Sequence, residues 1–177
     1  MKLTNDIIGG LAGAIVLNVL QELAAHTLPA APRLDKLGEE ALTRVVEKAG
    51  GEAPKGKALF ASALAGDLTA NTLYYSMIGK GKDTSLLARG AGFGLAAGIG
   101  ALYLTPAMGL DEKTVAKTSS TKIMTVAWYL AGGLAAALAI KALRKRGDAH
   151  PVTKTLEKWV EKAPASVRPA LSAVTSK

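Results

Sequence analysis

Cysteine is absent from all 177 residues of the sequence. This absence excludes disulfides, thiolate metal sites and cysteine nucleophiles together, and it leaves the redox compartment open. Histidine occurs only twice, and aromatic residues make up 5% of the chain. No Gly-x-Ser-x-Gly elbow occurs either, and the glycine-rich segment 79–82 lacks the spacing of a Walker sequence. We therefore expect no metal site and no cofactor, and catalysis is the less favoured class of function.

What the chain has instead is apolar residues, which make up 49% of it and lie in clusters. Four clusters reach or approach the roughly 20 residues that an α-helix needs to cross hydrocarbon. They are residues 7–28, 58–79, 86–110 and 123–143. The first follows a single lysine and has no small-residue cleavage site, so it does not fit a removed signal peptide. The sequence predicts an all-α membrane protein whose residues 1–146 form an up-and-down bundle of four transmembrane helices.

Two shorter segments have one apolar and one charged face, which predicts helices that lie along the membrane surface. One is residues 34–49, between the first two predicted spans, whose leucines and valines share a face. The other is residues 152–160, where Trp159 lies among lysines. We expect residues 147–177 to form an amphipathic tail with little order at its end.

Glycine recurs every fourth residue in the third predicted span, at Gly90, Gly94 and Gly98. In water a glycine costs a helix about 1 kcal/mol relative to alanine. In a membrane, small residues at this spacing let two helices approach closely, so the pattern predicts a glycine zipper. Gly9 and Gly13 form a shorter pair of the same kind. Packing within the chain and homo-oligomerisation both remain open.

Polar side chains interrupt the first two spans, where each ionisable group costs about 2.5–3.5 kcal/mol on insertion scales. They recur at a spacing of four, which places them on one stripe of each helix. Alternating helix directions bring the end of the first span level with the start of the second and of the fourth. The sequence thus predicts a polar cavity formed by Asn18, Glu22, His26, Asp67, Asn71, Tyr75, Lys122 and Tyr129.

Three interpretations of these polar residues remain open. In the first, they hydrogen-bond between helices and hold the bundle together. In the second, Glu22, His26 and Asp67 handle protons or cations inside the cavity. A metal site is the third, because Glu22 and His26 are four residues apart, but the second ligand pair of di-iron bundles is missing.

The net charge of the chain is +8, and its basic residues lie between the spans and after the last one. Membrane lipids are therefore the expected partner and nucleic acid is not, since no recognition motif accompanies the charge. The predicted headgroup contacts are Arg89, Arg144, Lys145, Arg146 and Trp159. Basic residues are nearly balanced between the two sides of the bundle. The cluster directly after the last span favours cytoplasmic termini.

In size and span pattern the chain resembles small bacterial membrane proteins, which implies a location in the bacterial inner membrane. We expect a non-enzymatic accessory, oligomerising or lipid-binding component of a membrane assembly, with a protein partner or a second copy. One alternative is a small transporter or channel that uses Glu22, His26 and Asp67. Others are an intramembrane lipid-headgroup enzyme, with His26 as base and Lys122 or Arg89 holding phosphate, and a soluble helical bundle.

Overall fold

The computed structural model describes residues 2–146, and this part of the chain is helical and has no strand. Its helices are α1 (Lys2–Thr27), α2 (Leu34–Lys48), α3 (Lys57–Ser76), α4 (Leu86–Ala107), α5 (Lys113–Ala116) and α6 (Ser119–Arg146). Two short 3-10 turns join α3 to α4, namely η1 (Met77–Gly79) and η2 (Asp83–Ser85). The all-α class predicted from the sequence is confirmed.

Three helical segments are long and apolar enough to cross a membrane, namely Lys2–Thr27, Asp83–Ala107 and Ser119–Lys145. They correspond to the first, third and fourth spans predicted from the sequence. The second predicted span coincides with α3, which is not among the three. Polar residues interrupt its apolar sequence, and the most polar of those in its central part are Asp67 and Asn71.

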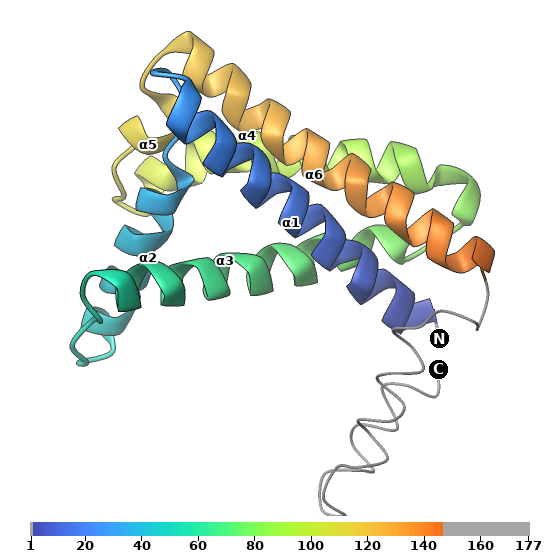
Figure 1. Ribbon diagram of the computed structural model, residues 1–177, viewed down its shortest axis with the longest axis horizontal. Coiled ribbons are helices and arrows are strands. Elements are labelled where there is room, and N and C mark those ends of the chain that lie inside the picture. Colours follow the sequence, from blue (N-terminus) through green and yellow to red (C-terminus); the bar gives the residue numbers. More distant parts are fainter. Residues whose placement is uncertain (1, 147–177) are drawn as a thin grey trace, which may run out of the picture.

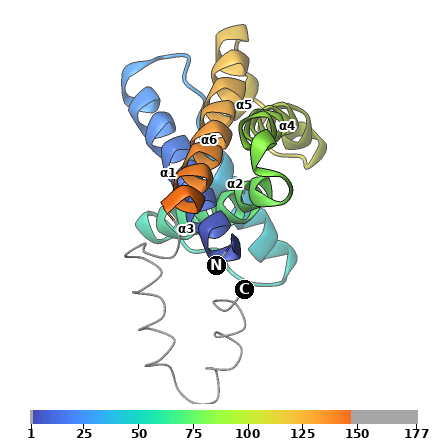
Figure 2. The ribbon, with the colours of Figure 1, turned by 90° about the vertical axis from the view of Figure 1, so that its right-hand side faces the viewer.

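α6 lies between α1 and α4 and runs antiparallel to both (Figures 1 and 2). Early residues of α1 meet late residues of α6, as Gly9 faces Ile140. In the same way Gly98, late in α4, faces Val126, early in α6. The three helices that qualify as membrane spans therefore form one layer with α6 at its centre.

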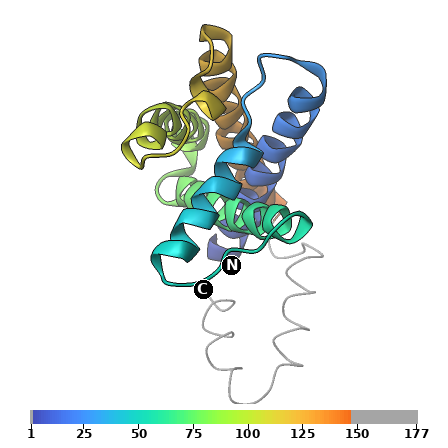
Figure 3. The same ribbon diagram turned by 90° about the vertical axis from the view of Figure 1, so that its left-hand side faces the viewer.

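α3 packs on α1 and crosses it at an angle (Figure 1). The contact is antiparallel, because Gly10 near the start of α1 faces the backbone of α3 close to its end. α2 packs across the first part of α3 (Figure 3), where Gly38 lies opposite Ala63. α2 coincides in sequence with the helix predicted at 34–49. The one predicted at 152–160 lies outside the described residues.

Small residues lie at many helix contacts inside the bundle, and many large apolar side chains face outward. Larger side chains share the core, namely Leu17, Tyr75, Ile78, Leu86 and Ile140. The buried small residues include Gly13, Ala14, Gly94, Ala136 and Ala137. Leu23 of α1, Leu104 of α4 and Ile123 of α6 are 60%, 60% and 69% exposed. Further outward-facing apolar residues are Leu11, Ile15, Val19, Leu95, Ile99 and Leu138. The bundle thus presents to its surroundings the side chains that a soluble protein normally buries.

The start of α6 is fixed by reciprocal hydrogen bonds between Thr118 and Thr121. The Thr118 Oγ1 accepts the Thr121 N–H at 3.1 Å, and the Thr121 Oγ1 accepts the Thr118 N–H at 3.2 Å. A capping box of this kind satisfies backbone donors that the first turn of a helix leaves open. The Thr121 hydroxyl also donates to the Ala30 carbonyl at 2.9 Å, which ties the segment after α1 to α6.

Candidate functional site

A polar cluster lies where α1 and α3 meet. Asn18 Nδ2 of α1 donates to Asp67 Oδ2 of α3 at 2.8 Å, and Asn71 Nδ2 donates to Asp67 Oδ1 at 2.9 Å. Asn18 Nδ2 also donates to the Ala14 carbonyl at 3.0 Å, so both of its hydrogens are used. Each oxygen of the Asp67 carboxylate therefore accepts one amide hydrogen bond.

A small cavity of about 40 Å³ opens beside this cluster, between α1, α2 and α3. Its polar lining comes from Asn18, Gln21, Glu22, Asp35 and Asp67. The Gln21 side chain is buried, with 9% of the residue exposed, and its Nε2 has no hydrogen-bond partner. Phe60, Leu64 and other apolar residues complete the wall. The cavity is thus a small space whose lining is partly polar and partly apolar.

Glu22 reaches this cavity, but His26 does not line it. The two side chains contact each other instead, with Glu22 Oε1 and His26 Nε2 2.9 Å apart, and they are 60% and 74% exposed. They form a surface pair at the end of α1. Of the three residues predicted to handle protons or cations together, the structure brings Glu22 and Asp67 to one cavity and leaves His26 outside.

The lining of this cavity does not include Tyr75, Lys122 or Tyr129. Tyr75 is fully buried, and its hydroxyl donates to the Tyr129 carbonyl at 2.9 Å, which joins α3 to α6. Gly132 leaves room for that hydroxyl, since a Cβ at this position would lie 2.9 Å from the Tyr75 Oη. Lys122 is exposed near the start of α6. These three predicted residues therefore do not join the Asn18–Asp67 cluster.

Asp35 borders the cavity from α2, but its charge is balanced. Arg33 donates from Nε and Nη2 to the two Asp35 carboxylate oxygens, at 2.9 and 2.7 Å. Partial burial raises the pKa of Asp35, and the hydrogen bonds and charge of Arg33 lower it by more, so the pKa lies below its ordinary value. Asp35 therefore stays ionised as one half of an ion pair.

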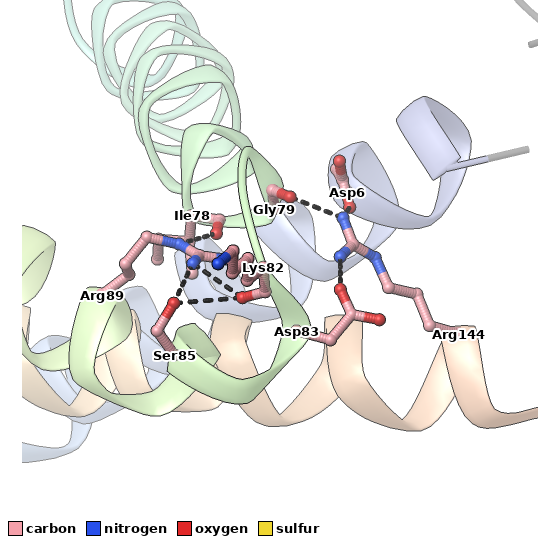
Figure 4. Close-up of polar contacts among 8 residues, drawn as sticks. All are labelled: Asp6, Ile78, Gly79, Lys82, Asp83, Ser85, Arg89 and Arg144. Carbon is pink, nitrogen blue, oxygen red and sulfur yellow. Dashed lines mark hydrogen bonds and ion pairs between the residues drawn. The ribbon is translucent and has the colours of Figure 1, made fainter.

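A second polar cluster closes the end of the bundle that holds the start of α1 and the end of α6 (Figure 4). Arg144 Nη2 donates to Asp6 Oδ1 and to the Gly79 carbonyl, at 2.6 Å each, and its Nη1 donates to Asp83. The Arg144 side chain is only 10% exposed. One guanidinium thus joins α1, the turn between α3 and α4, and α6.

Arg89 holds the same turn from α4 (Figure 4). Its Nε donates to the Ile78 carbonyl at 2.8 Å, and its Nη1 donates to the Lys82 carbonyl at 2.8 Å and to the Ser85 hydroxyl. Two of the three arginines predicted to contact headgroups, Arg89 and Arg144, are thus engaged by protein acceptors. Lys145 is exposed, whereas the side chain of Arg146 and all of Trp159 lie outside the described part of the chain.

The predicted packing glycines lie against α6. Gly90, Gly94 and Gly98 are buried on one face of α4, and a Cβ at Gly94 would lie 2.7 Å from both the Leu130 Cα and the Tyr129 carbonyl oxygen. On α1, Gly9 and Gly13 are buried against the later part of α6. The structure therefore gives all five of these glycines a neighbouring helix within the same chain.

Six polar residues whose side chains take part in these clusters were not among the predicted site residues, namely Asp6, Gln21, Arg33, Asp35, Asp83 and Ser85. Gln21 had a usable signal, because it lies three residues after Asn18 on the same side of α1. Asp6 had no such signal, since its partner Arg144 is 138 residues away in sequence.

Comparisons of the chain with protein-family models, with curated proteins and with solved structures found no match.

Proposed function

We propose that this protein is a multi-pass membrane protein that serves as a non-enzymatic component of a membrane assembly. The observation that carries the proposal is the set of large apolar side chains that face outward from α1, α4 and α6, together with small residues at the contacts between these helices. In water, contiguous apolar surface of this kind marks an interaction site or causes aggregation. In a bilayer the same surface is solvated by lipid, and close packing of small residues holds the helices together.

We further propose that α3 crosses the membrane as a fourth span and that α2 lies at the membrane surface. α3 runs antiparallel to α1, and its central Asp67 accepts hydrogen bonds from Asn18 and Asn71 and so faces protein. The turn after α3 lies beside both the start of α1 and the end of α6, because Arg144 joins the three. This arrangement supports an even number of crossings, with the start of α1 and the end of α6 on the same side of the membrane. We assign that side to the cytoplasm of a bacterium.

A role in assembly is supported by small residues that residues 2–146 leave uncovered. Gly92 of α4 has no atom within 4 Å of the position its Cβ would occupy, and Ala96, four residues later, is exposed. Small residues on the outer face of a membrane helix permit close approach of another helix, from a second copy or from a partner protein. The outer apolar residues around them, such as Leu95 and Ile99, would then contact lipid or that partner.

The absence of cysteine makes the membrane arrangement directly testable. Single-cysteine variants Lys82→Cys, in the turn after α3, and Lys117→Cys, just before α6, both place a thiol on an exposed residue. A membrane-impermeant maleimide should label Lys82→Cys only in inside-out vesicles and Lys117→Cys only in right-side-out vesicles. Labelling of both from the same side, or recovery of the protein in the soluble fraction, would contradict the proposed arrangement.

A further inference from the structure

Exposed lysines gather at the end of the bundle that Arg144 closes. Arg144 binds Asp6, Asp83 and the Gly79 carbonyl, and each of these lysines is within four residues of Arg144 or of one of its partners. They come from the start of α1, the turn between α3 and α4, and the last part of α6, and they are Lys2, Lys80, Lys82, Lys141 and Lys145. We call this surface the lysine end. The fold thus brings together basic residues from opposite ends of the described chain.

Acidic residues do not neutralise the lysine end. In the described part of the chain, its two carboxylates are those of Asp6 and Asp83, and Arg144 binds both. None of the lysines takes part in an ion pair there. At the opposite end several basic residues pair with acidic neighbours, as Lys36 does with Glu39. The two ends therefore hold similar numbers of basic residues but differ in net charge.

The turn that holds Lys80 and Lys82 is fixed by its backbone. Arg89 donates to the carbonyls of Ile78 and Lys82, both at 2.8 Å, and Arg144 donates to the Gly79 carbonyl (Figure 4). The fold thus uses the carbonyl of Lys82, and its exposed side chain stays available to a partner. A lysine presented by an ordered turn loses little backbone freedom when it binds.

Exposed apolar side chains border the lysine end and indicate which kind of anion it fits. Leu3 follows Lys2 directly and is 45% exposed, and Met77 and Leu87, on either side of the lysine-bearing turn, are each 42% exposed. A phospholipid presents phosphate beside acyl chains, whereas a nucleic acid presents phosphate without them. Lysine suits the lipid surface, because its apolar stem can lie along the chains while its ammonium group reaches the headgroups.

We propose that the lysine end binds the headgroups of anionic phospholipids in the leaflet that it faces. The inference rests on the proposed membrane location and names a lipid partner, which the role in assembly leaves open. It also replaces Arg89 and Arg144, whose donors protein acceptors engage, with lysines as the headgroup contacts. Each basic residue near an anionic surface strengthens association roughly fivefold, so several of them together favour anionic over neutral lipid.

The lipid preference of the full-length protein in phosphatidylcholine bilayers tests this proposal. Spin-labelled phosphatidylglycerol or spin-labelled phosphatidylcholine with the same acyl chains is added in trace amount, and electron paramagnetic resonance measures the fraction held beside the protein. We expect phosphatidylglycerol to associate about twofold or more strongly. High salt should reduce this preference, because it screens exposed charges. Inorganic phosphate at constant ionic strength should not reduce it, since the partner is the lipid and not free phosphate.

Two triple variants locate the preference on the surface. One removes three charges of the lysine end, by Lys80→Gln, Lys82→Gln and Lys141→Gln. The matched control removes three exposed lysines around the loop between α2 and α3, where Glu47 and Glu52 accompany them, by Lys48→Gln, Lys55→Gln and Lys57→Gln. The first variant should lose about half of the preference or more, and the control should keep most of it.

Equal association of the two lipids with the unsubstituted protein would overturn the proposal, and so would equal losses in the two triple variants or removal of the preference by inorganic phosphate. Failure of the underlying membrane location gives a different result. A protein outside the bilayer would restrict the motion of neither spin-labelled lipid, whereas a membrane-spanning protein without a lipid preference would restrict both to the same extent.

Discussion

Gly92 and Gly94 are two residues apart on α4 and have opposite surroundings. Gly94 is buried, and any side chain there would meet the backbone of α6 at Leu130 and Tyr129. Gly92 is exposed, and nothing in the described part of the chain covers it. About half a helical turn thus separates a glycine that the fold requires from one that it does not, and the pair forms an internal comparison.

We predict that Gly94→Leu destabilises the protein and that Gly92→Leu does not. Overpacking of a tight interior costs about 1–3 kcal/mol and sometimes more, and here the first clash is with backbone, which cannot rotate aside. The measurement is the melting temperature of each variant in detergent, together with its size on a gel-filtration column. Similar melting temperatures for the two variants would show that the close approach of α4 to α6 is dispensable.

The position of each residue on its helix also explains why only some of the predicted cavity residues meet in the structure. Asn18, Glu22 and His26 share a stripe at a spacing of four, but each step of four residues turns about 40° beyond a full turn of helix. Over the two steps to His26 the stripe rotates away from α3, and α3 crosses α1 at an angle (Figure 1). Asn18 therefore meets Asp67, whereas His26 faces outward. The spacing identified the polar residues, but the crossing of the helices decided which of them meet.

At the scale of the helix, local sequence was sufficient to locate most elements. The predicted segments 58–79 and 86–110 coincide with α3 plus η1 and with α4, because apolar composition and flanking glycine and proline act within a few residues. The four-residue α5 was not predicted, since so short a helix has no periodicity to detect. The contact of α6 with both α1 and α4 was not predictable either. Small residues occur on several helices, and they do not indicate which helices pack against each other.

The beginning of α6 depends on one threonine more than on its neighbours. Thr121 is 1% exposed, and it accepts the backbone N–H of Thr118 and donates to Ala30. We predict that Thr121→Val lowers the free energy of unfolding by about 1–3 kcal/mol, because it keeps the shape and leaves buried polar groups without partners. Denaturant titration in mixed micelles would measure it.

Ser120→Ala is the control for this prediction, since Ser120 is exposed in the same turn. It should change the free energy of unfolding by no more than about 0.5 kcal/mol, the usual range for surface positions. Equal losses for the two variants would mean that the first turn of α6 contributes through helix propensity and not through its tie to Ala30.

Over the whole molecule, Arg144 connects segments that lie far apart in the sequence. It joins Asp6, Gly79 and Asp83, which belong to α1 and to the turn between α3 and α4 (Figure 4). The sequence placed Arg144 in a basic cluster typical of headgroup contacts, and no local pattern marked Asp6 as its partner. Ion pairs across more than a hundred residues follow from the tertiary arrangement alone, which is why this cluster escaped sequence analysis.

We predict that Arg144→Leu destabilises the folded protein strongly, by about 3–5 kcal/mol, because it leaves the buried Asp6 carboxylate without its partner. Lys145→Leu, next to it in α6 and exposed, should have little effect. Addition of Asp6→Asn to Arg144→Leu should restore part of the loss, since it removes the unpaired charge. Thermal denaturation in detergent measures all three. If the double variant were no more stable than Arg144→Leu, the ion pair with Asp6 would not be the cause.

The central position of α6 has a consequence for how the chain is made. Among the described helices, α6 is the last to leave the ribosome, yet α1 and α4 both pack their glycines on it. About 90 residues separate the end of α1 from the start of α6, so at the usual 5–20 residues per second α1 waits roughly 5–20 seconds for its partner. Under the proposed membrane location, its glycine face meets lipid during that time. A polypeptide that stops before α6 lacks the helix that joins the layer, and it leaves the small-residue faces of α1 and α4 without their partner.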